Sequence, residues 1–494
     1  TEGFDQDVWI GTTRGAVRML SDNTFHYFQR DRWLPGDNVH AIAVDGKTVY
    51  IATDKGLGII RYEPYTLAKK AAFFEKHLEA YGQKRLGFTH ALTWDEEKKQ
   101  WARNVSDNDG GNTGHYLAAM SFKYAATGDE AARQEAVESF KAMIWLEEIT
   151  GVPGLVARSI WCDEDKEAWS EEIGSGGLPP KWNRVAGTPW EWKGDTSSDE
   201  VVAHFYAVAV FHDLAAQGTE KKRAEEHLRR IAYHILDNGW KLRDIDGKNT
   251  RWGRWEPEYL LRPYGFYARG LNGMQAQSFM ITTHALVGDD RSQQGLQQLL
   301  DWGYQYYTVR QKVTFPPSEV ATWDDRLAFD CYYLLLRYTQ DPHLHSIYMR
   351  SLERSWEIKR MEKVAWFNFL YGAITGNDCD TAAAIDDLQG WPIDMENYYY
   401  SHSHRADLAP LPDYPPYGGG TRAIPARETE PRISSRTTLP YEIEQKFHTI
   451  QMPVGWLEDY WMGRYYGFIK APDTTDPTLL TPAPFPMGPS STMS

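Results

Sequence analysis

The stretch that decides the fold is WEWKGDTSSDEVVAHFYAVAVFHDL, residues Trp190–Leu214. From Val201 onward nearly every position is apolar, so a helix formed here is buried on all sides rather than along one stripe. Ser197, followed three residues later by Glu200, has the form of a capping box, which places the start of the helix at this point. A helix of this kind lies inside a larger helical assembly.

The segment that follows has a different pattern, and the two patterns alternate along the chain. In 219–238 the residues Ala224, Leu228, Ile231 and Ile235 form one apolar stripe on a charged helix. The amphipathic segments are 67–82, 130–150, 219–238, 292–306, 342–362 and 380–389, and the apolar segments are 112–127, 196–216, 269–286, 324–339, 365–375 and 457–468. Six hairpins, each with an exposed outer and a buried inner helix, predict a mainly α protein, an (α/α)6 toroid over residues 65–470.

The flanking segments have other patterns. Residues 1–64 contain two short β repeats, because Val8–Gly15 is echoed by Val49–Gly56 at a spacing of 41 residues, which is in the range of one propeller blade. A closed propeller needs about four to eight blades. Either upstream blades have been removed, or the segment packs against the next domain. Residues 390–455 predict a long loop excursion, and 471–494 a Pro/Thr/Ser-rich tail.

The composition excludes several classes of function. The net charge of −15, with no basic tract, argues against nucleic acid and against an anionic membrane surface. No apolar run reaches the length of a membrane span, and three scattered cysteines form no disulfide framework. The chain starts at Thr1 without a signal peptide, as expected of a processed or trimmed product. The 20 Trp and 29 Tyr suit stacking on sugar rings or other planar ligands.

The candidate catalytic residues lie in the polar stretches that enter the inner helices. These stretches line the mouth of a toroid, and acids or histidines placed there suit proton transfer. The candidate catalytic residues are Asp199, Asp195, Glu200, Asp109 and His204. The alternative interpretation is structural. Glu200 then only caps the helix, Asp199 only interacts favourably with the helix dipole, and His204 is a buried histidine with hydrogen-bond partners in the core.

A second set of residues predicts binding of a planar or anionic ligand. Tryptophans interleaved with arginines, as in Arg251–Glu256, can stack on rings while guanidinium groups pair with carboxylate or sulfate; the alternative is loop packing with cation–π contacts. The candidate substrate-binding residues are Trp190, Trp192, Arg251, Trp252, Trp255, Arg269, Trp323, Asp324, His402, His404 and Arg405.

No cofactor is expected, and a divalent metal is only a weak alternative. The acidic turn Asp107–His115 resembles a calcium loop, but its register lacks the ligands that an EF-hand needs. His402 and His404 with Asp407 have a spacing that suits a metal only weakly. A phosphate loop, a G-x-S-x-G elbow, an HExxH motif and a CxxC motif are all missing from the sequence.

The region 107–468 resembles an uncharacterised helical domain found beside two-component-regulator-type propellers in secreted bacterial proteins. The matching motifs are Ser106–Gly110, Gly151–Gly154, Gly194–Glu200, Gly247–Gly253 and Tyr460–Tyr465. The resemblance implies the toroid architecture and a secreted, periplasmic or cell-surface location. It supplies no activity. Other (α/α)6 toroids are mostly carbohydrate-active enzymes, which is an analogy at the level of the fold.

These observations predict a carbohydrate-active enzyme that cleaves a polysaccharide, with an acidic one favoured. A glycoside hydrolase would draw its acid and base from Asp109, Asp195, Asp199 and Glu200. A polysaccharide lyase would instead use a base and a carboxylate-neutralising group. The residues for those roles are His115, His204, Tyr206, Arg251 and Asn272. The alternative is a non-catalytic glycan-binding or structural module of the cell surface.

Among the acids, Asp199 is the favoured proton-transfer residue. A Glu200 bonded back to Ser197 is expected to stay ionised and structural, whereas Asp199 is free to face the mouth. Asp195 is expected to lie beside Asp199, because two close carboxylates raise one pKa, as a general acid requires.

Overall fold

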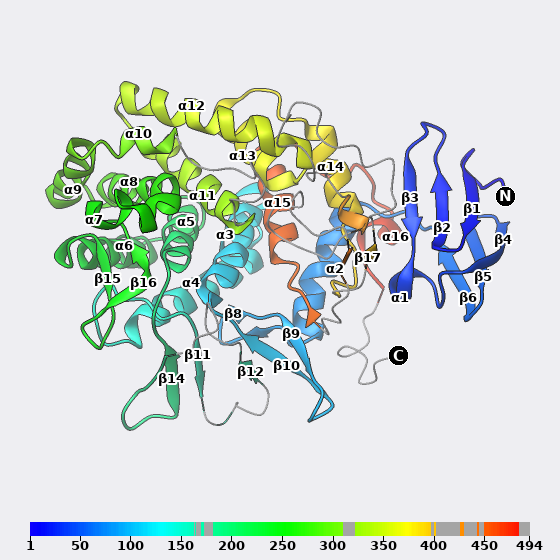
Figure 1. The fold of residues 1–494 in the computed structure, drawn as a ribbon, viewed down its shortest axis with the longest axis horizontal. Helices are drawn as coiled ribbons and strands as arrows, with labels where there is room; N and C mark the ends of the chain where they lie inside the picture. Colours follow the sequence, from blue (N-terminus) through cyan, green and yellow to red (C-terminus); the bar gives the residue numbers. More distant parts are fainter. Residues whose placement is uncertain are drawn as a thin grey trace.

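The computed structural model describes residues 1–162, 164, 169–171, 181–309, 322–396, 400–401, 425–428, 442–443 and 449–483. A large helical ring occupies most of the molecule, and a small β unit lies at one end of it (Figure 1). Among the described residues, no helix is long and apolar enough to cross a membrane.

Six helices form the inner ring, and they match the six apolar segments of the sequence. They are α3 (Asp109–Thr127), α5 (Ser198–Leu214), α8 (Arg269–Val287), α11 (Thr322–Tyr338), α13 (Ala365–Thr375) and α15 (Val454–Tyr465). Each packs against the next in this order, and α15 packs against α3, which closes the ring. In α5 every residue from Glu200 to Phe211 is buried, as the unbroken apolar run predicts.

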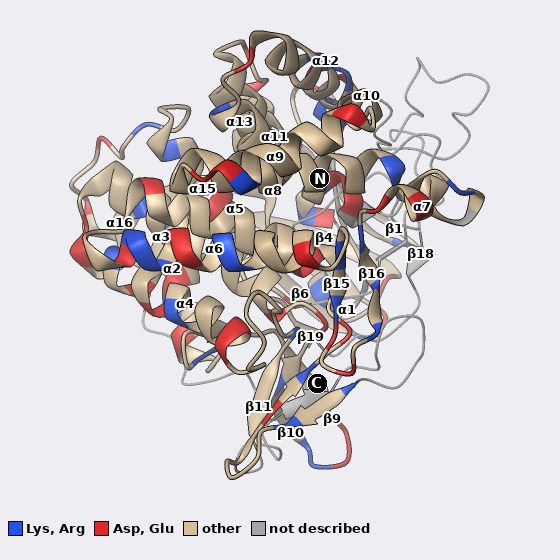
Figure 2. Ribbon diagram, turned by 90° about the vertical axis from the view of Figure 1, so that its left-hand side faces the viewer, with Lys and Arg blue, Asp and Glu red and all other residues tan. Residues whose placement is uncertain are grey.

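Six amphipathic helices lie outside this ring. They are α2 (Leu67–Ala80), α4 (Glu130–Glu148), α6 (Thr219–Asp237), α9 (Asp290–Asp301), α12 (Pro342–Lys359) and α14 (Thr381–Gly390). Figure 2 shows charged residues spread along α2, α4 and α6. The apolar stripe of α6 is buried, so the predicted alternation of outer and inner helices is confirmed for the described part of the chain.

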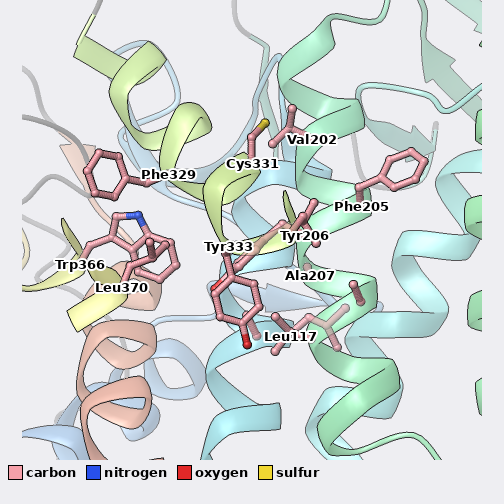
Figure 3. Packing of buried hydrophobic residues seen from close by; sticks show 14 of the residues in the cluster. Leu117, Val202, Phe205, Tyr206, Ala207, Phe329, Cys331, Tyr333, Trp366 and Leu370 are labelled. Carbon is pink, nitrogen blue, oxygen red and sulfur yellow. The ribbon is translucent and has the colours of Figure 1, made fainter. Parts of the chain in front are cut away.

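The middle of the ring is filled by side chains. Tyr206 of α5 packs edge-on against Tyr333 of α11 and Trp366 of α13, with ring centroids 5.5 Å and 5.6 Å apart (Figure 3). At the α3–α5 crossing, Gly110 and Gly114 stand where a Cβ would meet Glu200 and Ala207. The two glycines therefore let these helices approach closely.

A buried lysine links the first outer helix, α2, to the end of the last outer helix, α14. Lys70 of α2 donates hydrogen bonds from Nζ to the backbone oxygens of Leu388, Gln389 and Trp391, at the end of α14. The carbonyls at a helix C-terminus have no partner inside the helix, and a lysine is a suitable donor for them.

The segments outside the inner and outer helices contain strands and short helices that the sequence did not reveal. The strands are β7 (Lys84–Arg85), β8 (Phe88–Thr89), β9 (Leu92–Asp95), β10 (Gln100–Val105), β11 (Ile160–Cys162), β12 (Trp169–Glu171), β13 (Trp182–Arg184), β14 (Trp190–Lys193), β15 (Lys241–Arg243), β16 (Asn249–Arg254), β17 (Tyr400–Ser401), β18 (Glu442–Ile443) and β19 (Thr449–Ile450). The short helices are α7 (Pro257–Leu260), η3 (Pro263–Ala268), α10 (Gln305–Thr308), η5 (Arg360–Glu362), η6 (Ala426–Glu428) and α16 (Pro477–Leu480). Two stretches read as loops, around Trp190 and around Arg251, are thus strands β14 and β16. Their partners β11, β13 and β15 are each only three residues long, which is too short for the alternating pattern of a strand to be recognised in the sequence.

The N-terminal unit contains two three-stranded antiparallel sheets, separated by the short helix α1 (Arg30–Trp33). The first sheet contains β1 (Val8–Thr12), β2 (Gly15–Met19) and β3 (Phe25–Phe28), and the second contains β4 (Val39–Asp45), β5 (Thr48–Thr53) and β6 (Gly56–Arg61). Thr12 pairs with Gly15 and Thr53 with Gly56, so the same tight turn recurs at the spacing of 41 residues. The predicted strands of the two repeats are present, and their likeness to propeller blades stays a prediction.

Candidate functional site at the mouth of the helical ring

The first turn of α5 carries two neighbouring acids with different surroundings. Glu200 is fully buried and accepts hydrogen bonds from the backbone N–H groups of Gly110 (2.7 Å) and Gly111 (3.2 Å) of α3. The predicted capping box is wrong: Ser197 makes no capping bond within the described structure and donates instead to Asn108. The glycines of α3 allow this approach and present the free N–H groups of a helix start.

Burial raises the pKa of Glu200 well above its ordinary value, and the charge of Asp109 raises it further. The sequence argument, which kept this carboxyl ionised, is therefore corrected. Its two backbone donors oppose the shift but are outweighed by the loss of water. Glu200 thus joins α5 to α3 and has no surface through which to meet a substrate.

His204 belongs to a buried chain of polar groups that leads away from the mouth. Its Nε2 lies 4.0 Å from Glu200, and its Nδ1 lies 2.9 Å from Nε2 of His227 on α6. His227 in turn lies 2.6 Å from Glu147 of α4, which is paired with Arg230. Both histidines are fully buried, and burial lowers the pKa of His204 well below its ordinary value. The structural interpretation of His204 fits this arrangement better than a catalytic one.

Glu147 gives this chain a testable pH dependence. Burial alone would raise its pKa, but hydrogen bonds from Arg230 and His227 lower it to about 2 from an ordinary 4.5. A lowered carboxyl pKa adds stability above pH 4.5, and this stability is lost as the pH falls from 4.5 toward 2. The shift corresponds to roughly 3 kcal/mol.

We therefore expect Glu147→Gln to lower the free energy of unfolding by roughly 3 kcal/mol at pH 7, and by much less near pH 2.5. Urea denaturation at a series of pH values measures the difference. Glu148→Gln is the matched control, because the neighbouring Glu148 is more than half exposed in its pair with Arg223. A constant difference between wild type and Glu147→Gln across this pH range would contradict the assignment.

Asp109 and Asp195 are both held by structural contacts. Asp109 is 1% exposed and accepts hydrogen bonds from the backbone N–H and the hydroxyl of Ser106. Asp195 forms a salt bridge with Arg251. Its Oδ1 also accepts a hydrogen bond from the backbone N–H of Arg251, at 3.0 Å. Asp195 and Arg251, expected to act on substrate, thus bind each other and fasten β16 to the start of α5.

Asp199 is the acid of this turn that keeps access to solvent. It is half-buried, and burial raises the pKa of its carboxyl above the ordinary value. Arg158 opposes this shift and Asp107 adds to it. The sequence argument expected Asp195 to be the acid that raises the pKa of Asp199; the acid in this position is Asp107, from the turn that precedes α3.

Arg158 is a member of the site that the sequence did not suggest. It is 3% exposed and donates hydrogen bonds to the backbone oxygens of Asp195 and Asp107, each at 2.8 Å. Its Nη2 is buried and has no hydrogen-bond partner within the described residues. No local pattern marks this arginine, because its role depends on the convergence of two distant turns.

Asp324, in the first turn of α11, shares the electrostatic field of Asp199. Burial raises the pKa of Tyr267, a hydrogen bond with Tyr259 raises it further, and the charges of Asp324 and Asp199 both add to the shift. Asp324 is half-buried, and Tyr267 is 45% exposed. Two half-buried carboxylates and an exposed phenol therefore gather where α5 and α11, which pack against each other, begin.

The predicted aromatic residues divide into core and surface. Trp192 and Trp255 are 2% and 0% exposed, so their rings belong to the core and not to a ligand-facing wall. Trp190 is half-buried and packs edge-on against Trp145, with 4.8 Å between ring centroids. These positions correct the sequence interpretation: Trp190 and Trp192 share the face of β14 that packs on one apolar cluster, and Trp255 lies in the main core.

Other predicted binding residues remain near the surface. Trp252 on β16 is 39% exposed. Arg269 is half-buried, donates to the backbone oxygen of Leu260, and lies over the ring of Phe266, which is 63% exposed. The side chain of Trp323 lies outside the described residues, as do His402, His404 and Arg405. The described residues contain no group of three or more His, Cys, Asp or Glu arranged to hold a metal ion.

The ring contains a charged cluster deeper than these acids. Arg326 of α11 forms ion pairs with Glu458 and Asp459 of α15 and with Asp330 of its own helix. Glu458 also lies 2.8 Å from Nδ1 of His115 and accepts a hydrogen bond of 2.9 Å from the hydroxyl of Tyr206. These residues converge from four inner helices, α3, α5, α11 and α15.

Burial acts differently on each group of this cluster. It raises the pKa of Asp330 to about 7, because the more distant Arg326 only partly offsets the loss of water. The pKa of Glu458 is lowered despite burial, since Arg326 and His115 favour its charged form. Burial and Arg326 lower the pKa of His115. The sequence offered His115 as a candidate residue of a lyase, but it did not reveal Glu458 as its partner, because the two residues are 343 positions apart.

Comparison with known proteins gives similarities of fold and no family. No family model matches the chain, and no curated protein matches it either. Solved structures with a similar course of the chain include glycoside hydrolases and endoglucanases. A family 76 glycoside hydrolase from a bovine Bacteroides thetaiotaomicron strain has a TM-score of 0.46 at 9% identity, covering 92% of this chain and 89% of the other.

An endoglucanase variant from Alicyclobacillus acidocaldarius has a TM-score of 0.44 at 11% identity, covering 95% and 98% of the two chains. The endoglucanase CelQ from Clostridium thermocellum, in complex with cellotriose, has a TM-score of 0.39 at 12% identity, covering 84% and 73%. These values say what the chain is similar to and do not assign its activity.

Proposed function

We propose that the protein is a glycoside hydrolase that cleaves a polysaccharide, with Asp199 as the general acid. The observation that carries this proposal is the state of Asp199: it reaches solvent at the start of a buried inner helix, and its pKa is raised. A raised pKa favours the protonated carboxyl, which is the form that can donate a proton to the leaving oxygen of a glycosidic bond.

Asp324 is the proposed second carboxylate. It starts the neighbouring helix α11, and its charge acts on the same tyrosine, Tyr267, as that of Asp199. In an inverting hydrolase this residue would activate water, with the two carboxyl groups about 6.5–9.5 Å apart. Asp324 replaces Asp195 in this role, because Asp195 is committed to Arg251.

The preference for an acidic polysaccharide stays a prediction from the sequence. Arg251 and Arg254, which the sequence offered for a substrate carboxylate, are paired with Asp195 and Glu256. Arg158 lies beside Asp199, but its Nη2 is buried, so it offers no exposed donor to a uronate carboxylate.

The proposed function is tested by incubating the protein with a panel of neutral and uronate-containing polysaccharides. New reducing ends without UV absorbance support hydrolysis. Binding on a glycan array without turnover during long incubation contradicts hydrolysis and supports the glycan-binding module instead.

A lyase is the second candidate, and the contact between His115 and Glu458 favours it. A histidine whose Nδ1 is held by a carboxylate can remove a proton through Nε2, and Tyr206 lies on the same carboxylate. A product with an unsaturated, UV-absorbing end, together with its loss in His115→Gln, would establish this activity in place of hydrolysis.

The exposed aromatic rings at the mouth are expected to bind sugar. Phe266→Ala removes a ring that is 63% exposed on η3, and we expect KM to rise about 2- to 10-fold with little change in kcat. The control is Tyr65→Ala, because Tyr65 is an exposed ring that precedes the outer helix α2 and lies outside the segments that enter the inner helices. An equal change in KM for both variants would contradict a role of Phe266 in binding.

A further inference from the structure

The two β repeats of the N-terminal unit pack on each other through one apolar interface. The first repeat contains β1–β3 and the second β4–β6. Trp9 and Ala16 of the first repeat lie in one buried cluster with Val49 and Ile51 of the second. Three of these side chains are fully buried, and Trp9 is 1% exposed.

The second repeat contributes Val49 and Ile51 to this interface. The residues at the same positions of the first repeat are exposed instead. At the spacing of 41 residues, Val8 corresponds to Val49 and Ile10 to Ile51. Val49 and Ile51 are 0% exposed, whereas Val8 is 36% and Ile10 is 42% exposed. We call the surface formed by Val8 and Ile10 the front face.

The opposite comparison gives a second exposed surface. Ala16 and Arg18 of the first repeat correspond to Leu57 and Ile59 of the second. Ala16 is 0% and Arg18 is 6% exposed, whereas Leu57 is 57% and Ile59 is 54% exposed. We call the surface formed by Leu57 and Ile59 the rear face.

The front and rear faces are thus the two halves of an interface that the chain already forms once internally. Figure 1 shows β1, β4, β5 and β6 at the far end of the unit from the helical ring. Exposed apolar residues clustered on a sheet indicate an interaction surface. A rear face presented by one molecule matches the front face of another, because their counterparts within one chain already pack together.

We propose that the front face binds the rear face of a second copy of this chain, so that copies assemble head to tail through their repeats. Such an interface is heterologous, and it either closes into a ring or extends into a filament. A propeller closes with about four to eight blades. Since each chain supplies two repeats, a closed ring contains two to four copies.

Sedimentation velocity and light scattering on the full chain test this proposal. We expect the wild-type protein to have two to four times the mass of one chain if the ring closes, and a larger mass that grows with concentration if the assembly extends into a filament. Ile10→Lys disables the front face and Leu57→Lys the rear face, so each variant alone is expected to be a monomer. The control is Ile245→Lys, because Ile245 is 51% exposed outside the β unit, and this variant keeps the wild-type mass.

Mixing the two variants distinguishes an interface from misfolding. Ile10→Lys retains an intact rear face and Leu57→Lys an intact front face. An equimolar mixture therefore forms one contact and yields dimers that do not grow further. A monomeric wild type, or a mixture that stays monomeric, overturns the proposal. The two faces would then bind β repeats that do not come from a second copy of this chain.

Discussion

Asp199→Asn is expected to lower kcat on the polysaccharide substrate about 10²–10⁴-fold, which is the range that general acid catalysis contributes. The thermal unfolding temperature is expected to stay close to that of wild type, because Asp199 is half-buried and its bonded neighbour is the adjacent Ser198. An amide keeps the shape of the side chain and cannot donate the proton. Initial rates and calorimetry on the same preparations measure both effects.

The pH profile gives this prediction a second measurement. A general acid works only while it holds its proton, so activity falls as the pH rises through its raised pKa. We expect this alkaline limb in wild type and its loss in Asp199→Asn. Near-full activity of the variant would exclude Asp199 as the acid.

Glu200→Gln is the matched comparison, because it makes the same chemical change one residue along the same turn. In the wild type, the carboxyl oxygens of Glu200 accept hydrogen bonds from the backbone N–H groups of Gly110 and Gly111. The amide of the variant turns its own N–H toward one of these donors. We expect a loss of about 1–3 kcal/mol in the free energy of unfolding, with kcat changed far less than in Asp199→Asn. A loss of kcat without a loss of stability would exchange the two roles.

Arg326→Met is expected to lower the free energy of unfolding by about 3–5 kcal/mol, the range found when one partner of a buried ion pair is removed. The variant leaves Glu458, Asp330 and Asp459, all almost fully buried, without their common cation. It also removes a guanidinium that lies 3.5 Å from the centroid of the Trp366 ring. Urea denaturation at pH 7 measures the loss.

The loss is expected to shrink at lower pH. A buried carboxyl with a raised pKa destabilises the fold above its unfolded pKa, and this penalty disappears as the pH falls below it. Asp330 already has a pKa of about 7 in wild type, against 3.8 when exposed, and removal of Arg326 raises it further. Adding Asp330→Asn to Arg326→Met is expected to restore part of the stability. A loss below about 1 kcal/mol at pH 7 would contradict a cluster held by this arginine.

The helical fold could be predicted because its signal is local. The buried run Val201–Phe211 and the stripe Ala224–Ile235 each specify a helix and its environment through the spacing of apolar residues. Alternation of the two patterns then leaves few arrangements open. The 41-residue repeat is of the same kind, and both copies form the same turn, at Gly15 and at Gly56.

The partners and the burial of the individual acids depend on tertiary contacts. Asp199 and Glu200 are neighbours in one turn, and the sequence ranked Asp199 first because it assumed that Glu200 bonds to Ser197. The ranking agrees with the solvent access of Asp199, but the reason differs: Glu200 is bound by the backbone of α3, about ninety residues earlier in the chain.

The sequence by itself therefore determined which segments are helices and which of their faces are buried, because side-chain spacing along one element fixes both. Only the tertiary structure decided that Asp195 belongs to Arg251, that Arg158 lies beside Asp199, and that Arg326 holds three acids. Each of these depends on charges brought together from distant turns. The pKa of a carboxyl follows from the burial and the partners found there, and neither is encoded in its neighbours along the chain.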